Sequence, residues 1–576
     1  MWRDESVTWQ VAHRPLGELW ELLGQVDAVH GLYYLLMHAV FEATGAATPD
    51  ADLWALRLPS VAATALAASG VAAVAHHLTG ALRGGDGSDV PEPAPPGGSG
   101  QPHRPGGPDR PDSPGGPDRP DTPAPAAGPG APDRPAGPNR LDRSNGFGGP
   151  DPSGGPGGSD RLDRAGGPDR SGGLDGSDCL DRSDSPGPSD PPDHSDRSGA
   201  SDRPDRSGGP GGSDRLGRPD RSARLGRSGL SGRVALLAGV GYAVLPPVQM
   251  YAQEGRSYAF VAAAVVWATY LMLRERWVGY VVVLVLGCWL HEFAVLALPA
   301  HAFAAGRSRG WRLAAWAVVA ALLPLALVSA RQAQQQLGWL GRPSWQDWAA
   351  YGVLAAASLL LARGAPRELV RVALPLALLP PGLLLAISLV HPWYVDRYVL
   401  YALAGFALLA GARLATSRGW WVWPLVGVLL VPVGFWSAWL RTPDSRKDDA
   451  RAVAAAVGAL ARPGDAVLFL PSRRREWLLS SPETYGSLRD LALSRTPAAS
   501  RSLQGVERTP EEIQAALLDP AVDRVVALLD PAGQPVDGYP AEAVKRQTLV
   551  SSFDLCSVTD VRGARVALFA RPGGCP

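Results

Sequence analysis

The fold is decided by residues 257–290, which read SYAFVAAAVVWATYLMLRERWVGYVVVLVLGCWL. Two apolar segments in this stretch are separated only by Arg274, Glu275 and Arg276. Each segment is somewhat shorter than the ~20 residues that a perpendicular membrane helix needs, so a tilted helix or a locally thinner bilayer is implied. We interpret both segments as membrane spans, because neither has a polar face.

Similar apolar segments occur along most of the chain. The first, at 58–75, is rich in alanine, and the others follow in close order after residue 232. The sequence therefore predicts an α-helical polytopic membrane protein with about ten spans. The later spans are expected at 234–252, 257–273, 277–290, 293–305, 313–330, 349–363, 369–390, 398–416 and 419–440.

Residues 277–305 are compatible with one tilted helix or with two short helices that turn at His291–Glu292. Arginines both precede this stretch and follow it, at 274–276 and 307–312. Positively charged residues favour the cytoplasmic side, and only two short helices place both clusters there. We therefore predict a break at His291.

The same rule assigns sides to the loops. Those expected outside the cell carry Asp4–Glu5, Gln253–Glu254, His291, Gln332–Trp348 and His391–Arg397. Ten spans with an external start also place the C-terminus outside. Because an external start needs something to export it, we expect one further helix upstream of Met1. Residues 10–45 show helical spacing of leucines among acidic residues, which is typical of amphipathic helices at a membrane surface.

Residues 84–232 form an insert of Gly, Pro, Ser, Asp and Arg with almost no apolar side chains. Such a segment cannot offset the entropy lost on ordering, so we predict a disordered cytoplasmic insert. Its aspartates largely balance its arginines, which argues against a nucleic-acid partner. The insert separates 1–83, with the first external loop and the first span, from the main membrane domain at 233–440.

Residues 441–576 are expected to form a small extracytoplasmic α/β domain. Helices are predicted at 448–461 and 510–517, and strands at 466–470, 524–529 and 564–569. No glycine-rich phosphate loop opens these helices, and we assign this domain no chemistry. Cys556 and Cys575 flank its last strand, where a disulfide is possible only in an oxidising compartment.

The amino-acid composition excludes few classes of function on its own. Arginine and lysine together equal aspartate and glutamate, at 55 each, so the net charge of zero indicates no partner. The four cysteines lie far apart, with no CxxC pair and no Cys/His ligand spacing, so we expect no metal site. Cys288 lies within an apolar run and is interpreted as a packing residue.

Polar side chains concentrate at the expected external ends of the spans. Ionisable groups there are costly to desolvate and usually face a cavity, which makes them candidates for function. The set comprises Asp4, Glu5, Asp27, His30, Gln253, Glu254, Arg256, Tyr258, His291, Glu292, His391, Asp396, Arg397 and Tyr398.

Each candidate also has a plain structural interpretation. Asp4 and Glu5 are also compatible with solvated charges, and Glu254 with a simple ion pair to Arg256. His291 is equally consistent with a neutral histidine at a helix turn, and Arg397 with a side chain that reaches the interface.

Several motifs resemble the actinobacterial family 39 glycosyltransferases of the GT-C superfamily. These enzymes are related to protein O-mannosyltransferases and to the aminoarabinose and galacturonate transferases of lipid A. The resemblance covers roughly 1–83 and 233–440. It is carried by Trp2-Arg3-Asp4-Glu5, His13-Arg14-Pro15-Leu16, Asp27-Ala28-Val29-His30-Gly31-Leu32-Tyr33-Tyr34, Leu56-Arg57-Leu58-Pro59-Ser60, Tyr251-Ala252-Gln253-Glu254-Gly255-Arg256-Ser257-Tyr258 and Asp396-Arg397-Tyr398.

The resemblance implies an inverting, metal-independent transfer of a sugar from a polyprenyl phosphate to an external hydroxyl at the plasma membrane. Asp4 matches the carboxylate taken as general base, with Glu5 in support. Glu254, Arg256 and Arg397 match positions near the donor phosphate. The cavity is expected to include Asp27, His30, Gln253, Tyr258 and His291.

Mannose is the expected sugar, and the acceptor is a protein, glycan or lipid. No cofactor is expected beyond the lipid-linked donor, and membrane lipids are the surrounding partner. The same chemistry with arabinose or a uronic acid remains open. A transporter or a non-catalytic scaffold is the alternative from another class, although no repeated halves with matching broken helices are apparent.

Overall fold

A computed structural model describes residues 1–80, 221–337, 341–420 and 422–576. The predicted insert therefore lies largely outside the described residues. Its end was placed too late, because helix α5 begins at Arg221 and continues without interruption to Val244. The arginine-rich start of α5 lacks the apolar pattern on which the boundary at 232 depended.

The first part of the chain forms short helices, as its leucine spacing predicts. They are α1 (Arg3–Ala12), α2 (Leu16–Leu23), the 3₁₀ turn η1 (Ala28–His30) and α3 (Gly31–Thr44). Most of α1 is buried, whereas α2 buries Leu19 and Leu22 and exposes Leu16 and Trp20. Only α2 therefore keeps a large apolar surface.

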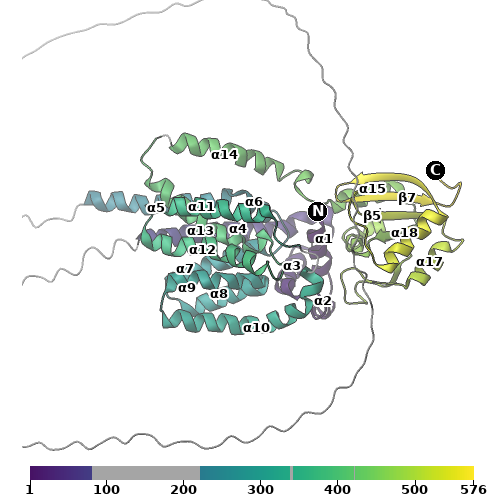
Figure 1. The fold of residues 1–576 in the computed structure, drawn as a ribbon, viewed down its shortest axis with the longest axis horizontal. Helices are drawn as coiled ribbons and strands as arrows, with labels where there is room; N and C mark the ends of the chain where they lie inside the picture. The colour runs from purple at the N-terminus through teal and green to yellow at the C-terminus, as the bar shows by residue number, and fades with distance from the viewer. Residues whose placement is uncertain (81–220, 338–340, 421) are drawn as a thin grey trace, which may run out of the picture. The chain divides into compact units, whose positions relative to one another are not determined.

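The membrane domain consists of the helices α4 to α14 (Figure 1). The helices are α4 (Pro49–Gly80), α5, α6 (Pro246–Ala252), α7 (Tyr258–Leu273), α8 (Trp277–Leu290), α9 (Ala297–Ala305), α10 (Arg309–Leu337), α11 (Trp345–Ala362), α12 (Arg367–Ile387), α13 (Leu403–Thr416) and α14 (Val422–Trp439). The 3₁₀ segments η3 (Glu292–Leu296) and η4 (Asp396–Ala402) precede α9 and α13.

Among the described residues, five helices are long and apolar enough to cross a membrane, or six if the bent pair α5–α6 is one span. The helices α7 and α8, and the pair η3–α9, are apolar but shorter. These long apolar helices are consistent with a multi-pass membrane protein. The predicted break at His291 is confirmed, since α8 ends at Leu290 and His291 has extended backbone angles.

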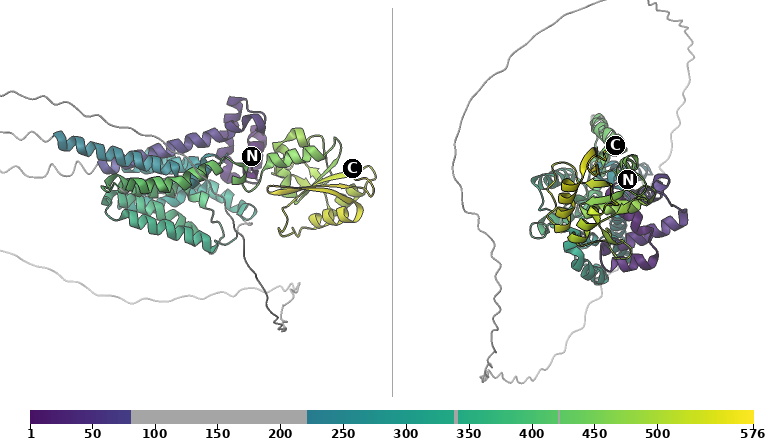
Figure 2. Two further views of the ribbon diagram at one scale, coloured as in Figure 1. Left: turned by 90° about the horizontal axis from the view of Figure 1, so that it is seen from above. Right: turned by 90° about the vertical axis from the view of Figure 1, so that its right-hand side faces the viewer.

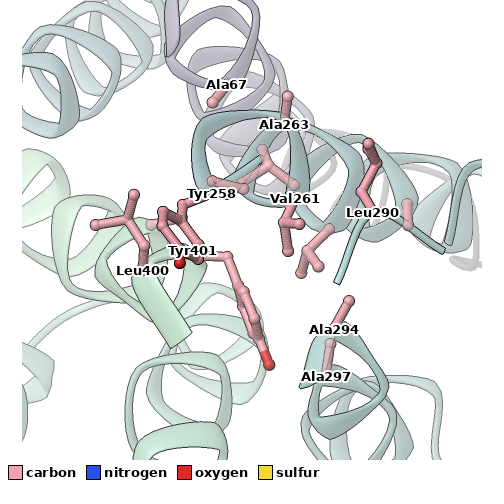
Figure 3. Packing of buried hydrophobic residues seen from close by; sticks show 14 of the residues in the cluster. Ala67, Tyr258, Val261, Ala263, Leu290, Ala294, Ala297, Leu400 and Tyr401 are labelled. Carbon is pink, nitrogen blue, oxygen red and sulfur yellow. The ribbon is translucent and has the colours of Figure 1, made fainter. Parts of the chain in front are cut away.

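The bundle is packed around small side chains. Helix α4 packs against α5 and α7, and α13 packs against α5 and α12. Ala67 of α4 lies among the buried residues near Tyr258 and Val261 of α7, and Tyr401 lies nearby (Figure 3). Tyr401 donates a hydrogen bond to the carbonyl of Phe293 at 2.9 Å, which ties η4 to η3.

The C-terminal domain is a five-stranded mixed sheet in the order β2-β1-β5-β7-β6. The strands are β1 (Ala466–Leu470), β2 (Arg489–Asp490), β5 (Arg524–Leu529), β6 (Asp554–Val561) and β7 (Ala564–Ala570), and β3 (Leu493–Arg495) pairs with β4 (Val506–Glu507) apart from this sheet. Strands β2, β1 and β5 are parallel, and β7 runs antiparallel to β5 and β6.

Helices cover both faces of the sheet (Figure 2). Alternate residues of β1 enter different cores, since Leu468 packs with α17 (Pro510–Leu518) and α18 (Pro540–Ser552), whereas Val467 packs with α15 (Ala450–Leu460). This alternation follows from the two-residue repeat of a strand. The strands β1, β5 and β7 and the helices α15 and α17 match their predicted positions closely; β6 and α18 were not predicted.

We expect Gly405→Leu to destabilise the bundle. A Cβ atom at Gly405 of α13 would lie 2.3 Å from the Ala373 carbonyl oxygen and 2.6 Å from the Ala377 nitrogen of α12. Because backbone cannot move aside easily, the cost should be at least the ~1–3 kcal/mol of an overpacked core. The midpoint of thermal unfolding in detergent should fall, whereas Gly427→Leu in α14, with nothing within 4 Å, should leave it nearly unchanged. Equal midpoints for both variants would contradict this packing.

Candidate active site

The structure brings the two acidic residues of α1 together with arginines from distant segments. The Asp4 carboxylate lies 3.7 Å from a terminal guanidinium nitrogen of Arg256, in the α6–α7 loop, and 3.5 Å from one of Arg397, in η4. Burial alone raises the pKa of Asp4, but the charges of Arg256 and Arg397 outweigh it and hold the pKa below its ordinary value. Asp4 is thus an ionised carboxylate.

Glu5 has a structural partner of its own. Arg57 of α4 donates two hydrogen bonds to the Glu5 carboxylate, at 2.8 and 2.7 Å. The Gly255 backbone N–H donates a third at 3.2 Å. Glu5 is fully buried, yet the Arg57 hydrogen bonds and charge keep its pKa below the ordinary value against the effect of burial. Glu5 therefore fixes α1 against α4 and the α6–α7 loop.

Glycine 255 allows this close approach. A Cβ atom at this position would lie 2.4 Å from the Leu56 Cγ atom. The Gly255 carbonyl also accepts a hydrogen bond of 3.0 Å from the Thr8 hydroxyl. The α6–α7 loop is thus held against both α1 and α4, which places Arg256 beside Asp4.

Arg397 is enclosed by aromatic rings rather than extended to an interface. Its guanidinium carbon lies 5.9 Å from the Trp2 ring, 5.4 Å from the Tyr258 ring and 5.9 Å from the Tyr398 ring. Its side chain is only 18% exposed. Aromatic faces attract a cation, so these rings hold Arg397 beside Asp4.

The histidines form the other side of the site. His30 and Asp27 are joined by a hydrogen bond of 2.8 Å, and Tyr34 donates a second hydrogen bond to Asp27. The His30 ring lies edge-on to the His291 ring at 5.7 Å, and the His291 ring lies 4.4 Å from that of Tyr398.

Glu254 does not pair with Arg256. Its carboxylate is buried, with 1% of the residue exposed, and its nearest cation is Arg446 at 3.5 Å. Neither carboxylate oxygen has a hydrogen-bond partner in the described residues. Burial raises the pKa of Glu254 to about 8, despite the charges of Arg446 and Arg397. Glu254 is therefore mostly protonated near neutral pH.

The C-terminal domain places a buried glutamate beside α1, a contact that the sequence did not reveal. Glu476, in η6 (Ser472–Ser480), is buried and lies 3.5 Å from the Arg3 guanidinium. Burial raises the pKa of Glu476 to about 7, although the Arg3 charge opposes this rise. Arg475 anchors η6 through Asp490 and Glu507, each at 2.6 Å. No sequence signal links these residues to α1.

Gln253 lies apart from the cluster around Asp4. It lines a neighbouring cavity of about 800 Å³, together with Trp2, Arg57 and Arg446. Trp2 also contacts Arg397, and Arg57 binds Glu5, so the cavity adjoins the acidic pair. Its volume lies within the range of small-molecule sites in proteins.

Four nitrogen atoms around Asp4 are buried without a hydrogen-bond partner among the described residues. They are Nε of Arg256, Nε of Arg397, Nε2 of His30 and Nδ1 of His291. Buried polar groups are normally paired, so this set requires an explanation. Guanidinium N–H groups are donors only, and an oxygen-rich anion would satisfy them.

No group of His, Cys, Asp and Glu suited to a metal ion occurs in the described parts of the chain. The structure joins Cys556 and Cys575 by a disulfide.

Comparisons with models of known protein families, with characterised proteins and with solved structures find no match. The site must therefore be interpreted from its own geometry.

We expect Arg57→Met to destabilise the protein strongly, because it leaves the buried Glu5 charge without its main partner. Loss of one partner from a buried ion pair typically costs about 3–5 kcal/mol. Thermal unfolding in detergent checks this, with Arg501→Met as the control, since the Arg501–Glu21 pair is 53% exposed on both sides and should contribute ~0–1 kcal/mol. A small effect of Arg57→Met would contradict the pairing.

Glu254 should make stability depend on pH. Its pKa rises from the ordinary 4.5 to about 8 on folding, so the destabilisation is absent below about pH 4.5 and grows as pH rises towards 8. Glu254→Gln removes this titration. Its unfolding midpoint should match that of the wild type at pH 5 and exceed it at pH 8. A difference that is the same at both pH values would refute the assignment.

Proposed function

We propose that the protein is a membrane glycosyltransferase that moves a sugar from a polyprenyl phosphate to an acceptor hydroxyl. The observation that carries this proposal is the Asp4 carboxylate between Arg256 and Arg397, whose Nε atoms are buried and have no hydrogen-bond partner among the residues that the structure describes. One ionised carboxylate and two arginines are the parts that such a transfer needs. The motifs that resemble family 39 glycosyltransferases contain the same three residues.

Asp4 is the general base in this proposal. It accepts the proton of the acceptor hydroxyl as the hydroxyl oxygen attacks the anomeric carbon. Because the neighbouring arginines lower its pKa, Asp4 is ionised throughout the physiological range. Its basicity is then modest, and the orientation of the acceptor supplies much of the rate.

Arg256 and Arg397 bind the donor phosphate. Both lie within 4 Å of Asp4, so an anion bound to them is close to the base. Charge builds up on the phosphate as the glycosidic bond breaks, and fixed guanidinium groups stabilise this charge without reorganising. Glu254, protonated near neutral pH, can donate a hydrogen bond to the same anion instead of repelling it.

Glu5, Tyr258 and the Gln253 cavity complete the proposed site. Glu5 positions α1 through Arg57, and Tyr258 packs against Arg397. The adjoining cavity provides an approach for the acceptor. Following the distribution of arginines in the loops, we place the site and the C-terminal domain on the outer face of the plasma membrane, in a bundle of about ten spans.

Mannose is the proposed sugar, and arabinose or a uronic acid are the alternatives within the same chemistry. Membranes that contain the full chain are supplied in turn with radiolabelled polyprenyl phosphates of the three sugars. Transfer of label from one of them to an endogenous acceptor supports the proposal. Failure with all three refutes it.

Asp4→Asn should abolish detectable transfer while the protein remains inserted. The amide cannot accept the proton, and loss of a general base typically lowers the rate by about 10²–10⁴-fold. Transfer in the membrane assay measures this, with Asp52→Asn as the control. Asp52 is a half-buried carboxylate that accepts hydrogen bonds from the Ala47 and Thr48 backbone, and its replacement should leave transfer unchanged. Normal turnover by Asp4→Asn would remove Asp4 from the mechanism.

A further inference from the structure

Asp27 and His30 form a pair whose geometry is that of an oriented acid or base. The Asp27 carboxylate accepts a hydrogen bond of 2.8 Å from Nδ1 of His30, and Tyr34 donates a hydrogen bond to its other oxygen. Asp27 has a left-handed backbone conformation, with φ of 61°, and begins the 3₁₀ turn that ends at His30. Asp tolerates this conformation better than most residues.

Orientation by Asp27 leaves the other imidazole nitrogen for chemistry. Because Nδ1 is bonded to Asp27, the Nε2 atom is the acceptor in neutral His30 and a second N–H donor in the imidazolium form. This Nε2 atom is buried and has no partner in the described residues. A satisfied packing histidine would have bonded it, as His301 shows by bonding Thr269 at 2.9 Å and Tyr280 at 3.0 Å through its two nitrogens.

A closed series of contacts connects His30 with Asp4. In one direction, Arg256 lies beside Asp4 and donates a hydrogen bond of 3.4 Å to the Tyr34 hydroxyl, which is bonded to Asp27. In the other direction, the His30 ring contacts the His291 ring, and the His291 ring packs against Tyr398. The Tyr398 ring lies against Arg397, which is the second cation beside Asp4. Four buried nitrogens of this series, on Arg256, Arg397, His30 and His291, have no hydrogen-bond partner in the described parts of the chain.

We propose that His30 is a further catalytic residue, the acid that protonates the leaving phosphate, and that Asp27 and Tyr34 are positioning residues for it. This inference rests on the proposed glycosyl transfer. Of the motif positions near the phosphate, Arg256 and Arg397 stabilise charge but cannot release a proton. Glu254 has Arg446 as its nearest cation and lies outside the series of contacts that joins His30 to Asp4. Histidine is the side chain suited to that step.

The step balances in atoms and charge. A bond forms between the acceptor oxygen and the anomeric carbon, and the bond from that carbon to the phosphate oxygen breaks. Asp4 gains the hydroxyl proton, and the His30 imidazolium gives its Nε2 proton to the leaving oxygen. The donor phosphodiester and the polyprenyl phosphate product then each carry one negative charge. Protons exchanged with solvent return both residues to their starting states.

Several charged or titratable groups act on His30. Asp27 and Tyr34 belong to its own segment, Asp4 comes from α1, Arg256 contacts Tyr34, and His291 and Glu292 follow α8. Asp27 is held ionised, since the His30 charge and hydrogen bond lower its pKa against the effect of burial. An ionised Asp27 accepts the hydrogen bond from Nδ1 of His30 and so leaves Nε2 as the atom for proton transfer.

The test compares two donors that differ in their need for a proton. One is the polyprenyl phosphate of the sugar used by the wild type in the donor panel, mannose in our proposal. The other carries the same sugar on a 4-nitrophenyl phosphate, whose leaving phosphate is less basic. For His30→Gln, kcat should fall by about 10²-fold or more with the prenyl donor. With the aryl donor the fall should be at least tenfold smaller.

His38→Gln is the matched control. His38 lies on α3 close in sequence to His30, and its Nδ1 atom bonds the Ala12 carbonyl at 2.8 Å, outside the series of contacts around Asp4. It should change neither rate. Asp27→Asn should lower kcat with the prenyl donor by a larger factor than with the aryl donor, because the His30 ring loses the carboxylate that orients its Nε2 atom.

The outcomes separate the two proposals. If the wild type transfers sugar but His30→Gln loses the same factor with both donors, or none, then His30 is not the acid and the glycosyl transfer stands. A loss of kcat in Asp27→Asn that is equal with both donors, or no loss, overturns the positioning role. If the wild type transfers no sugar from any donor, the proposed function fails and the role of His30 fails with it.

Discussion

The candidate site depends on the cost of burying two adjacent carboxylates at the edge of an apolar bundle. An unpaired buried charge is strongly unfavourable, so Asp4 and Glu5 each need a cation. Glu5 takes Arg57 in a two-pronged interaction and becomes a structural fixture. Asp4 takes Arg256 and Arg397 at longer distances, which leaves parts of those arginines unpaired. One acidic pair thus provides an anchor in Glu5 and, in our proposal, a general base in Asp4.

This division explains why the surrounding segments are arranged as they are. Gly255 lets the α6–α7 loop approach α4, and aromatic rings hold Arg397 without competing for its hydrogen bonds. Within the described residues, the unpaired buried atoms of this cluster include nitrogens of Arg256, Arg397, His30 and His291 and the carboxyl oxygens of Glu254. A protonated Glu254 adds a donor to this set. The whole group is therefore complementary to an anion, which is the basis of the proposed phosphate site.

Local sequence signals predicted much of this architecture. The break at His291 followed from the arginines on both sides of residues 277–305, and β1, β5 and β7 from short apolar runs between turns. Strand β6 was missed because it contains many polar residues and forms a strand through its pairing with β7, which the local sequence does not reveal. The beginning of α5 was missed because arginine and glycine conceal its helical pattern.

The membership of the site was predicted better than its pairings. Asp4, Arg256 and Arg397 were named from motifs, and the structure brings them together. The pairing of Glu254 with Arg446 was not foreseen, because 192 positions separate them and no local pattern connects them. Glu476 was missed for the same reason, since its contact with Arg3 joins residues that lie far apart in the sequence.

The most direct measurement is a cryo-EM structure of the full chain in lipid nanodiscs with a non-hydrolysable prenyl phosphonate of mannose. The account predicts phosphonate oxygens within hydrogen-bonding distance of Arg256 and Arg397, with the anomeric carbon next to Asp4. A phosphonate bound elsewhere on the protein, with Asp4 still enclosed by both arginines, would contradict it.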